Sequence, residues 1–179
     1  MDDEFDDRHD KVRQMPIFKK AIQIMELAHK ITAIVSKEDI ETEKEVYGEM
    51  LENHANYIAQ NAMTIPPKIA GAEGGDLYGI RMENAAIIRK AAREIMTDCT
   101  GLKMYGFKET EYLELLRNEV MEFQPLFAEW VKSFDPWNYI IDRWGLFNPP
   151  GVSYDDKDPD DDLPFDPSNF FDDFDDGDD

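Results

Sequence analysis

The chain contains few of the residues that covalent or metal-based chemistry needs. Cys99 is the only cysteine among 179 residues, which excludes an internal disulfide and a cysteine-based metal motif. It falls on an apolar helical stripe, and we interpret it as a core residue. Glu26 and His29 have the Glu-x-x-His spacing that di-iron helical proteins use twice, but the sequence has no second copy of it. We therefore predict no metal site and no cofactor.

Catalytic motifs are also missing. The four serines lie at predicted helix ends or in the tail, and none has a histidine nearby. His54 falls on an apolar stripe, which is typical of a packed core or interface histidine. The run Gly71-Ala72-Glu73-Gly74-Gly75 lacks the Lys-Ser/Thr pair of a phosphate-binding loop. We therefore predict that the protein is not an enzyme.

Long apolar runs are absent. No stretch approaches the ~18–20 uninterrupted apolar residues of a transmembrane helix. The first residues, Met1-Asp2-Asp3-Glu4-Phe5, are too acidic for a signal peptide. Together with the single cysteine, these features predict a cytoplasmic protein that does not bind membranes.

Basic residues are scarce, and the acidic ones are unevenly distributed. The net charge of −21 comes from 40 acidic and 19 basic side chains. Residues 1–10 hold six acids and one base, and residues 146–179 hold thirteen acids and one base. Residues 11–145 hold 21 acids and 17 bases, a net charge of only −4. The two tails therefore repel nucleic acid and anionic membranes, while the middle of the chain is close to ordinary in charge.

Four long segments show apolar residues at every third or fourth position, which is the period of a helix that buries one face. The predicted helices are 16–35, 39–64, a third that starts near residue 76 and ends at Gly106, and 109–134 with Pro125 inside it. Nothing in the sequence is typical of a strand. Short connections make neighbouring helices antiparallel, so we predict an all-α, up-down-up-down four-helix bundle over residues 16–134.

A stretch rich in proline and glycine separates the second predicted helix from the third. A proline inside a helix costs about 3 kcal/mol, because it removes a backbone donor and clashes with the preceding turn. We therefore expect the second helix to be interrupted here, with at most one further turn before the glycines. The residues of this predicted structural corner are Pro66, Pro67, Gly71, Gly74 and Gly75.

The segments outside the bundle differ from it in composition. Residues 1–15 and 146–179 are predicted to be disordered because they are highly charged and aperiodic. Residues 135–145 are predicted to form a short fifth helix, since Asp135-Pro136-Trp137 matches an N-cap followed by a first-turn proline. Aromatic residues alternating with aspartates are typical of segments that dock into a basic groove. The predicted partner-binding residues are Trp137, Trp144, Phe165, Phe170, Phe171 and Phe174.

Basic residues gather between the proline stretch and the end of the third predicted helix. Arg89 and Arg93 are four positions apart, so they share a helix face. A solvated face with intrachain salt bridges, a surface for nucleic acid or a partner, and a subunit contact through Arg81 all fit the pattern. The candidate nucleic-acid face consists of Lys68, Arg81, Arg89, Lys90 and Arg93.

The proline stretch also carries a family likeness. The run Ile65-Pro66-Pro67-Lys68-Ile69-Ala70-Gly71-Ala72-Glu73-Gly74 resembles the Ile-Pro-x-Asn-Ile-Ala-Glu-Gly corner of small bacterial four-helix bundle proteins. That family includes proteins encoded in intervening sequences of large-subunit ribosomal RNA genes, and the accessory variability protein of diversity-generating retroelements. Two further runs, Arg93-Glu94-Ile95 and Lys103-Met104-Tyr105-Gly106-Phe107, lie near family motifs, so the likeness covers roughly residues 16–134.

The resemblance implies an antiparallel bundle that assembles into a ring, commonly a pentamer. Retroelement members of the family are basic, and they bind nucleic acid and a reverse transcriptase through the outer ring surface. This chain departs from them in charge, which disfavours nucleic acid as a partner.

Three functions remain as hypotheses. The leading one is a non-catalytic, oligomeric helical-bundle adapter or scaffold, whose Trp137–Trp144 segment and acidic-aromatic tail bind a basic protein partner. The first alternative is a nucleic-acid-binding accessory protein that uses the basic face of the third predicted helix. The second alternative is an acidic protein that mimics nucleic acid.

Overall fold

The computed structural model describes residues 10–37 and 45–157, and all regular structure in these ranges is helical. This confirms the prediction of an all-α chain for the described residues. A short helical segment at 10–14 precedes four long helices. The long helices are α2 (Pro16–Val35), α3 (Glu45–Glu73), α4 (Tyr78–Met104) and α5 (Thr110–Lys132).

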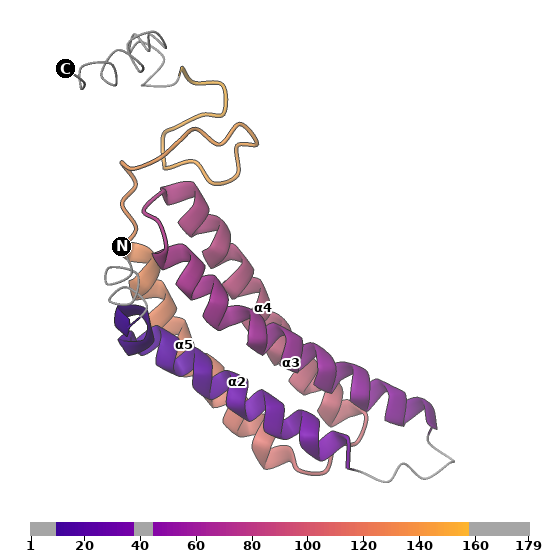
Figure 1. Ribbon diagram of the computed structural model, residues 1–179. Coiled ribbons are helices and arrows are strands. Elements are labelled where there is room, and N and C mark those ends of the chain that lie inside the picture. The colour runs from indigo at the N-terminus through magenta and orange to yellow at the C-terminus, as the bar shows by residue number, and fades with distance from the viewer. Residues whose placement is uncertain (1–9, 38–44, 158–179) are drawn as a thin grey trace, which may run out of the picture.

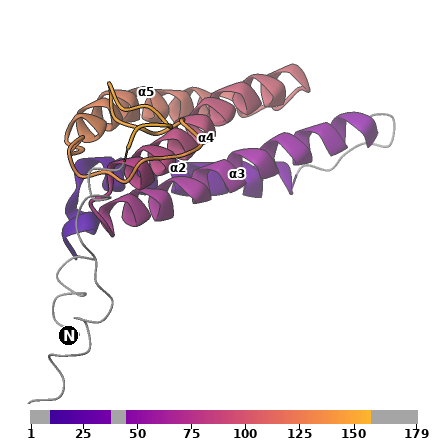
Figure 2. The same cartoon turned by 90° about the horizontal axis from the view of Figure 1, so that it is seen from above.

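The four long helices lie alongside one another (Figure 1). Packing is most extensive between α3 and α4, and α2 packs against both α3 and α5. The α4–α5 seam, the line of contact between these two helices, is the least extensive of the four. Viewed from above, the helices follow roughly one common direction (Figure 2). One seam of the molecule is therefore packed less completely than the rest.

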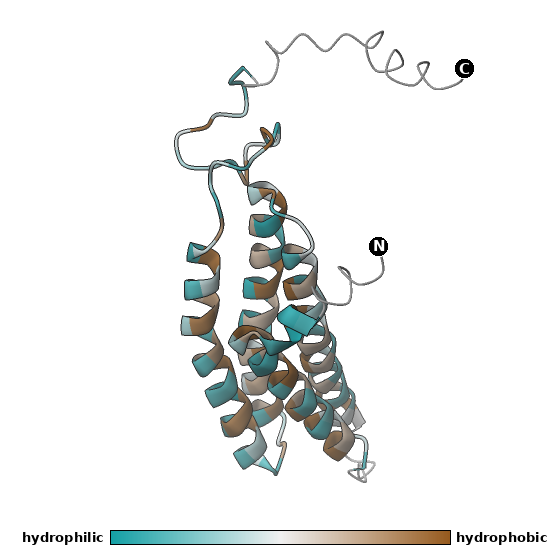
Figure 3. Ribbon diagram, turned by 60° about the vertical axis from the view of Figure 1, so that its left-hand side comes forward, coloured by the Kyte–Doolittle hydropathy of each residue, from teal (hydrophilic) through white to brown (hydrophobic). Residues whose placement is uncertain are grey.

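Each long helix contributes apolar residues to the buried core. Figure 3 shows hydrophobic and hydrophilic residues alternating along these helices in brown and teal. The bounds of α2 are as predicted, with Pro16 in the first turn, where its missing N–H costs nothing. Its stripe of apolar residues is also confirmed, because every buried residue of α2 belongs to it: Ile17, Ala21, Ile24, Ala28, Ile31 and Val35. The predicted helical period thus describes the core of this part of the chain.

The predicted interruption at Pro66 and Pro67 is wrong, because α3 continues through both prolines to Glu73. The two prolines deprive the carbonyl groups four residues earlier of their helical donors. However, Ile65 and Ile69 on either side are fully buried. Packing of this apolar face against the other helices outweighs the local cost, which is how most helices in proteins are stabilised. Of the predicted corner residues, only Gly74 and Gly75 lie in the connection.

The ends of α4 and α5 lie within a few residues of the predicted positions. Gly106 follows α4 with a φ of 92°, a conformation that glycine adopts without strain. The amide of Phe107 donates to the carbonyl of Leu102 over 3.0 Å, so this connection caps the helix as Gly106 predicted. Pro125 lies inside α5 with its side chain exposed.

The predicted fifth helix over residues 135–145 is wrong. Residues 135–157, the C-terminal loop, form turns instead. The Asp142 carboxylate accepts hydrogen bonds from the amides of Trp144, Leu146 and Phe147, at 2.9, 3.0 and 3.0 Å. Such bonds from side chain to backbone compete with helix formation. They also lower the pKa of Asp142, chiefly through Phe147 and Trp144.

The two segments predicted to be disordered overlap the described residues at 10–15 and 146–157. Residues 10–14 are helical and Val12 is buried, so the prediction for residues 1–15 is wrong over that part, and residues 1–9 lie outside the described ranges. Residues 146–157 belong to the C-terminal loop, which Arg143 closes by donating to the carbonyls of Tyr154 and Asp156. Residues 158–179, with Phe165, Phe170, Phe171 and Phe174, are also outside the described ranges.

We expect Pro67→Ala to stabilise the protein by about 1–2 kcal/mol. The substitution restores a helical donor inside α3, and this gain of ~3 kcal/mol is reduced by the greater freedom of the unfolded chain. Pro67 is exposed, so no core volume is lost. Chemical denaturation followed by circular dichroism measures the change, with Lys68→Ala on the same helix as the control. A midpoint that stays the same or falls would contradict this account of α3.

Candidate functional site

The α4–α5 seam is joined near its two ends and open between them. At one end Arg117 of α5 donates to the hydroxyl of Thr100 over 2.7 Å and to the carbonyl of Met96 over 3.2 Å. At the other end the Trp130 indole donates over 2.7 Å to the carboxylate of Glu73 on α3, which also pairs with Arg81 of α4, so the link from α5 to α4 there runs through α3. Thirteen residues separate Arg117 from Trp130, which is about 20 Å along a helix. These two contacts therefore lie about three to four helical turns apart along α5.

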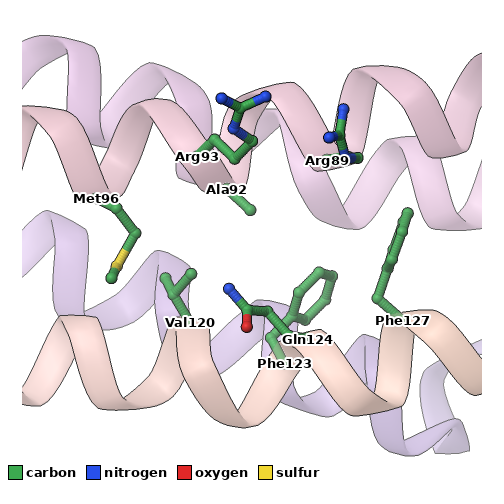
Figure 4. A pocket seen from close by; sticks show the side chains of 8 residues that line it. All are labelled: Arg89, Ala92, Arg93, Met96, Val120, Phe123, Gln124 and Phe127. Carbon is green, nitrogen blue, oxygen red and sulfur yellow. The ribbon is translucent and has the colours of Figure 1, made fainter.

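A cavity of about 430 Å³ occupies this open part and is called the α4–α5 groove. Its floor is apolar, since Val120 and Phe123 are fully buried and Met96 and Phe127 are half-buried. Figure 4 shows the lining side chains between the two helices, with both arginines on the α4 side. The lining residues are Arg89, Ala92, Arg93, Met96, Val120, Phe123, Gln124 and Phe127.

The two arginines of the groove are exposed and have no ion-pair partner among the described residues. The neighbouring carboxylates are already paired with lysines. Glu94 lies 3.2 Å from Lys90, and Lys20 of α2 contacts two glutamates of α5, Glu119 and Glu122. These two hydrogen bonds, Glu119 first, raise the pKa of Lys20. The groove thus combines an apolar floor with two unpaired cations, an arrangement suited to a ligand that is both apolar and anionic.

The candidate nucleic-acid face is only partly assembled. Arg89, Lys90 and Arg93 line one shallow surface depression on α4, together with Glu94 and Thr97. Lys68 lies on α3 and does not line it. Three of the five predicted residues therefore share a surface, and Arg81 does not belong to it.

Arg81 is turned into the protein, so its predicted place on a nucleic-acid face is wrong. Its side chain is only 12% exposed and forms an ion pair with Glu73. The guanidinium also lies 4.3 Å from the centre of the Phe134 ring, a cation–π contact. The same Glu73 oxygen accepts a hydrogen bond from the Trp130 indole N–H. The Trp130 and Phe134 rings pack edge to face. Arg81 therefore helps to join the end of α3, the start of α4 and the end of α5.

His54 is a packed residue, as its position on the apolar stripe predicted. Its Nδ1 lies 2.9 Å from the Asp98 carboxylate, and its ring stacks on Tyr105. The ring also fills the space beside Gly101, where a β-carbon would lie 2.5 Å from ring atoms. Asp98 and Gly101 were not predicted as partners of His54 from the sequence. A glycine inside a helix, which costs about 1 kcal/mol relative to alanine, was the signal for such a close approach.

Cys99 lies on the same helix as Asp98, but it offers no nucleophile at neutral pH. The residue is fully buried. Burial raises the pKa of its thiol to about 12 from an ordinary value of 9.0. The thiolate, which is the reactive form, is therefore rare at neutral pH. The polar contacts around His54 hold α3 against α4 rather than forming reactive chemistry.

The predicted partner-binding tryptophans are both in the C-terminal loop and both exposed. Trp137 is 86% exposed and Trp144 is 95% exposed, and Ile140 and Leu146 between and beside them are also largely exposed. The loop itself is attached to the helices. The amide of Tyr78 donates to the carbonyl of Asn138 over 2.8 Å, and Ile141 is buried.

The one Glu-x-x-His pair of the sequence lies on the surface of α2. Glu26 and His29 are both exposed on α2. Over residues 10–37 and 45–157, no three His, Cys, Asp or Glu side chains are grouped so that they could hold a metal ion. No helix in the described part of the chain combines the length and the apolar character that crossing a bilayer requires.

Comparisons of the chain with protein-family models, with curated proteins and with solved structures found no match. The resemblance to the small bacterial bundle family therefore stays a prediction, and so does the ring that it implies.

We expect Gly101→Ala to destabilise the protein by about 1–3 kcal/mol, although alanine is the better helix former. The added methyl group collides with the His54 ring, which Asp98 and Tyr105 hold in place. In a His54→Ala background the same change should stabilise by up to about 1 kcal/mol. Denaturation of the four chains of this double-mutant cycle measures the reversal.

Gly71→Ala is the matched control. Gly71 lies inside α3, and a β-carbon there would be 3.8 Å from its nearest neighbour, an ordinary contact. It should stabilise the protein in either background. An equal effect of Gly101→Ala with and without His54 would show that the ring does not occupy this space.

Proposed function

We propose that the protein is a non-catalytic adapter, built as an antiparallel four-helix bundle that self-assembles, and that it captures a basic protein partner with its C-terminal loop and acidic tail. The observation that supports this function is the exposure of Trp137 and Trp144 on a loop that is fixed by hydrogen bonds.

Exposed tryptophans on an ordered loop favour a binding role for physical reasons. Large apolar side chains in water are unfavourable by roughly 25 cal/mol per Å² of apolar surface, and covering them recovers that free energy. Tryptophan is also among the residues that contribute most to protein–protein affinity. The Asp142 carboxylate already fixes the backbone of residues 144–147, so binding has less conformational freedom to remove.

The charge of the sequence that follows the two tryptophans favours a basic partner. Residues 146–179 carry thirteen aspartates and one lysine. Such a field attracts positively charged proteins and raises the association rate, while apolar contacts determine how slowly the complex dissociates. Increasing salt should therefore slow association more than it speeds dissociation.

We expect Trp137→Ala together with Trp144→Ala to weaken partner binding at least about 30-fold, because truncating an interface hot spot costs about 2 kcal/mol or more. The partner would be recovered on the immobilised full chain, identified by mass spectrometry, purified and titrated by calorimetry. Helical content should stay unchanged, since both residues lie outside the helices.

Tyr57→Ala together with Met63→Ala is the matched control, because both side chains are about half exposed on α3. This pair should bind the partner normally. Equal affinity of the tryptophan variant and the unaltered chain would refute the adapter function of the loop.

A nucleic-acid-binding accessory function is the second candidate, favoured by the surface that Arg89, Lys90 and Arg93 share on α4. It predicts a salt-sensitive gel shift that is lost in the Arg89→Ala and Arg93→Ala variant, because each phosphate contact releases counterions. Lys19→Ala with Lys30→Ala, two exposed positions of α2, is the control for the same change in charge. The absence of any shift at low salt, both by the unaltered chain and by a chain without residues 158–179, would remove this candidate.

A further inference from the structure

We propose that the α4–α5 groove binds the chain's own acidic C-terminal segment, residues 158–179, with the phenylalanines of that segment on the apolar floor and its aspartates at Arg89 and Arg93. The proposal goes beyond the adapter function and does not depend on the exposed tryptophans.

The groove has the size and the lining that an aromatic segment needs. Its volume of about 430 Å³ falls in the range of pockets that bind molecules of substantial size. Val120, Phe123 and Phe127 provide an apolar surface from α5, and Met96 faces them from α4. A methionine side chain adapts its shape to neighbouring rings, and its sulfur makes favourable contacts with them. Met96 and Phe127 are only half-buried in the structure, so part of this apolar surface is accessible to water.

The C-terminal segment has the complementary chemistry. Residues 158–179 include eleven aspartates, no lysine and no arginine. Phe170, Phe171 and Phe174 lie within one stretch of five residues, and Asp172 and Asp173 lie between them in sequence. The same few residues therefore offer rings for an apolar floor and carboxylates for two cations.

Charge complementarity selects this occupant. Arg89 and Arg93 are the groove's two cations, and neither has an ion-pair partner among the described residues. They are four residues apart, about 6 Å along the helix, so neighbouring carboxylates of one segment can reach both. An arginine also holds a carboxylate through two parallel hydrogen bonds, which fixes its position more closely than a lysine would.

The chain is long enough to make this contact with itself. The C-terminal loop meets the start of α4, where the Phe147 carbonyl lies 3.7 Å from the position of a β-carbon on Gly79. From Gly79 to Arg89 and Arg93 is about 15–21 Å along α4. From Phe147 to Phe170 the extended chain spans up to about 75 Å. Attachment to the same chain also gives the segment a millimolar effective concentration at the groove. A separate acidic protein of equal affinity would need a higher concentration than this to displace the segment.

The test places a photocrosslinker in the full chain at Phe170 as benzoylphenylalanine, an aromatic residue of similar character. After irradiation, mass spectrometry should map crosslinks to groove residues such as Met96 and Gln124. Arg89→Ala with Arg93→Ala should lower their yield about tenfold, the effect of losing two exposed ion pairs. The same crosslinker at Tyr154, an exposed residue of the C-terminal loop, is the control and should not label the groove.

Three results would overturn the proposal. The first is crosslinks from position 170 that spread over other surfaces. The second is a crosslink between two different chains, detected in a mixture of isotope-labelled and unlabelled protein. Such a crosslink would place the segment on a second copy of the chain. The third is equal affinity of an oligonucleotide for the unaltered chain and for the Phe170→Ser, Phe171→Ser and Phe174→Ser variant. Equal affinity would mean that Arg89 and Arg93 are already free in the unaltered chain.

A second measurement does not depend on crosslinking. Anilinonaphthalene sulfonate, an apolar anion that matches the groove, should bind the triple serine variant several-fold more tightly than the unaltered chain. The added Arg89→Ala and Arg93→Ala substitutions should remove that gain. Equal dye binding by the unaltered chain and the serine variant would mean that the phenylalanines do not cover the groove.

Discussion

The carboxylate of Glu73 holds together the end of the molecule on which both candidate sites depend. One of its oxygens accepts hydrogen bonds from Arg81 and from Trp130, and so joins three helices. A half-buried carboxylate of this kind needs such donors, because removing a charge from water without a partner costs several kcal/mol. The junction closes one end of the α4–α5 groove. It also positions Phe134, which directly precedes the C-terminal loop.

The unequal packing of the four seams follows from the size of the side chains on them. On α4 the buried residues include Ala85, Ala91 and Gly101, and small residues allow the close association with α3. On α5 they include Phe123 and Trp130, and the α4–α5 seam is the least extensive of the four. Among the described helices, α4 therefore takes part both in the most extensive helix–helix contact and in the least extensive one.

The sequence was most informative where one physical effect dominated. The apolar period alone predicted α2 to the residue, since no other signal competes there. It failed at Pro66 and Pro67, where burial of Ile65 and Ile69 outweighs the local cost of the prolines. The prediction of a helix at residues 135–145 also failed. An N-cap pattern gives no information about the three backbone amides that donate hydrogen bonds to the Asp142 carboxylate.

The candidate sites were harder to predict because they are built from residues far apart in the sequence. Arg81 was assigned to a surface, since nothing near it in sequence indicates Glu73 or Phe134 as its partners. The α4–α5 groove could not be predicted at all, because it depends on how loosely two helices pack. Trp137 and Trp144 were found by composition alone, although the helix expected to carry them is absent.

The contact between His54 and Gly101 has a consequence for how the sequence can diverge. Because the ring fills the space of a missing side chain, position 101 accepts a larger residue only after position 54 has become smaller. Asp98 and Tyr105 lose their partner at the same step. In relatives of this protein the residues at positions 54, 98, 101 and 105 should therefore change together rather than one at a time.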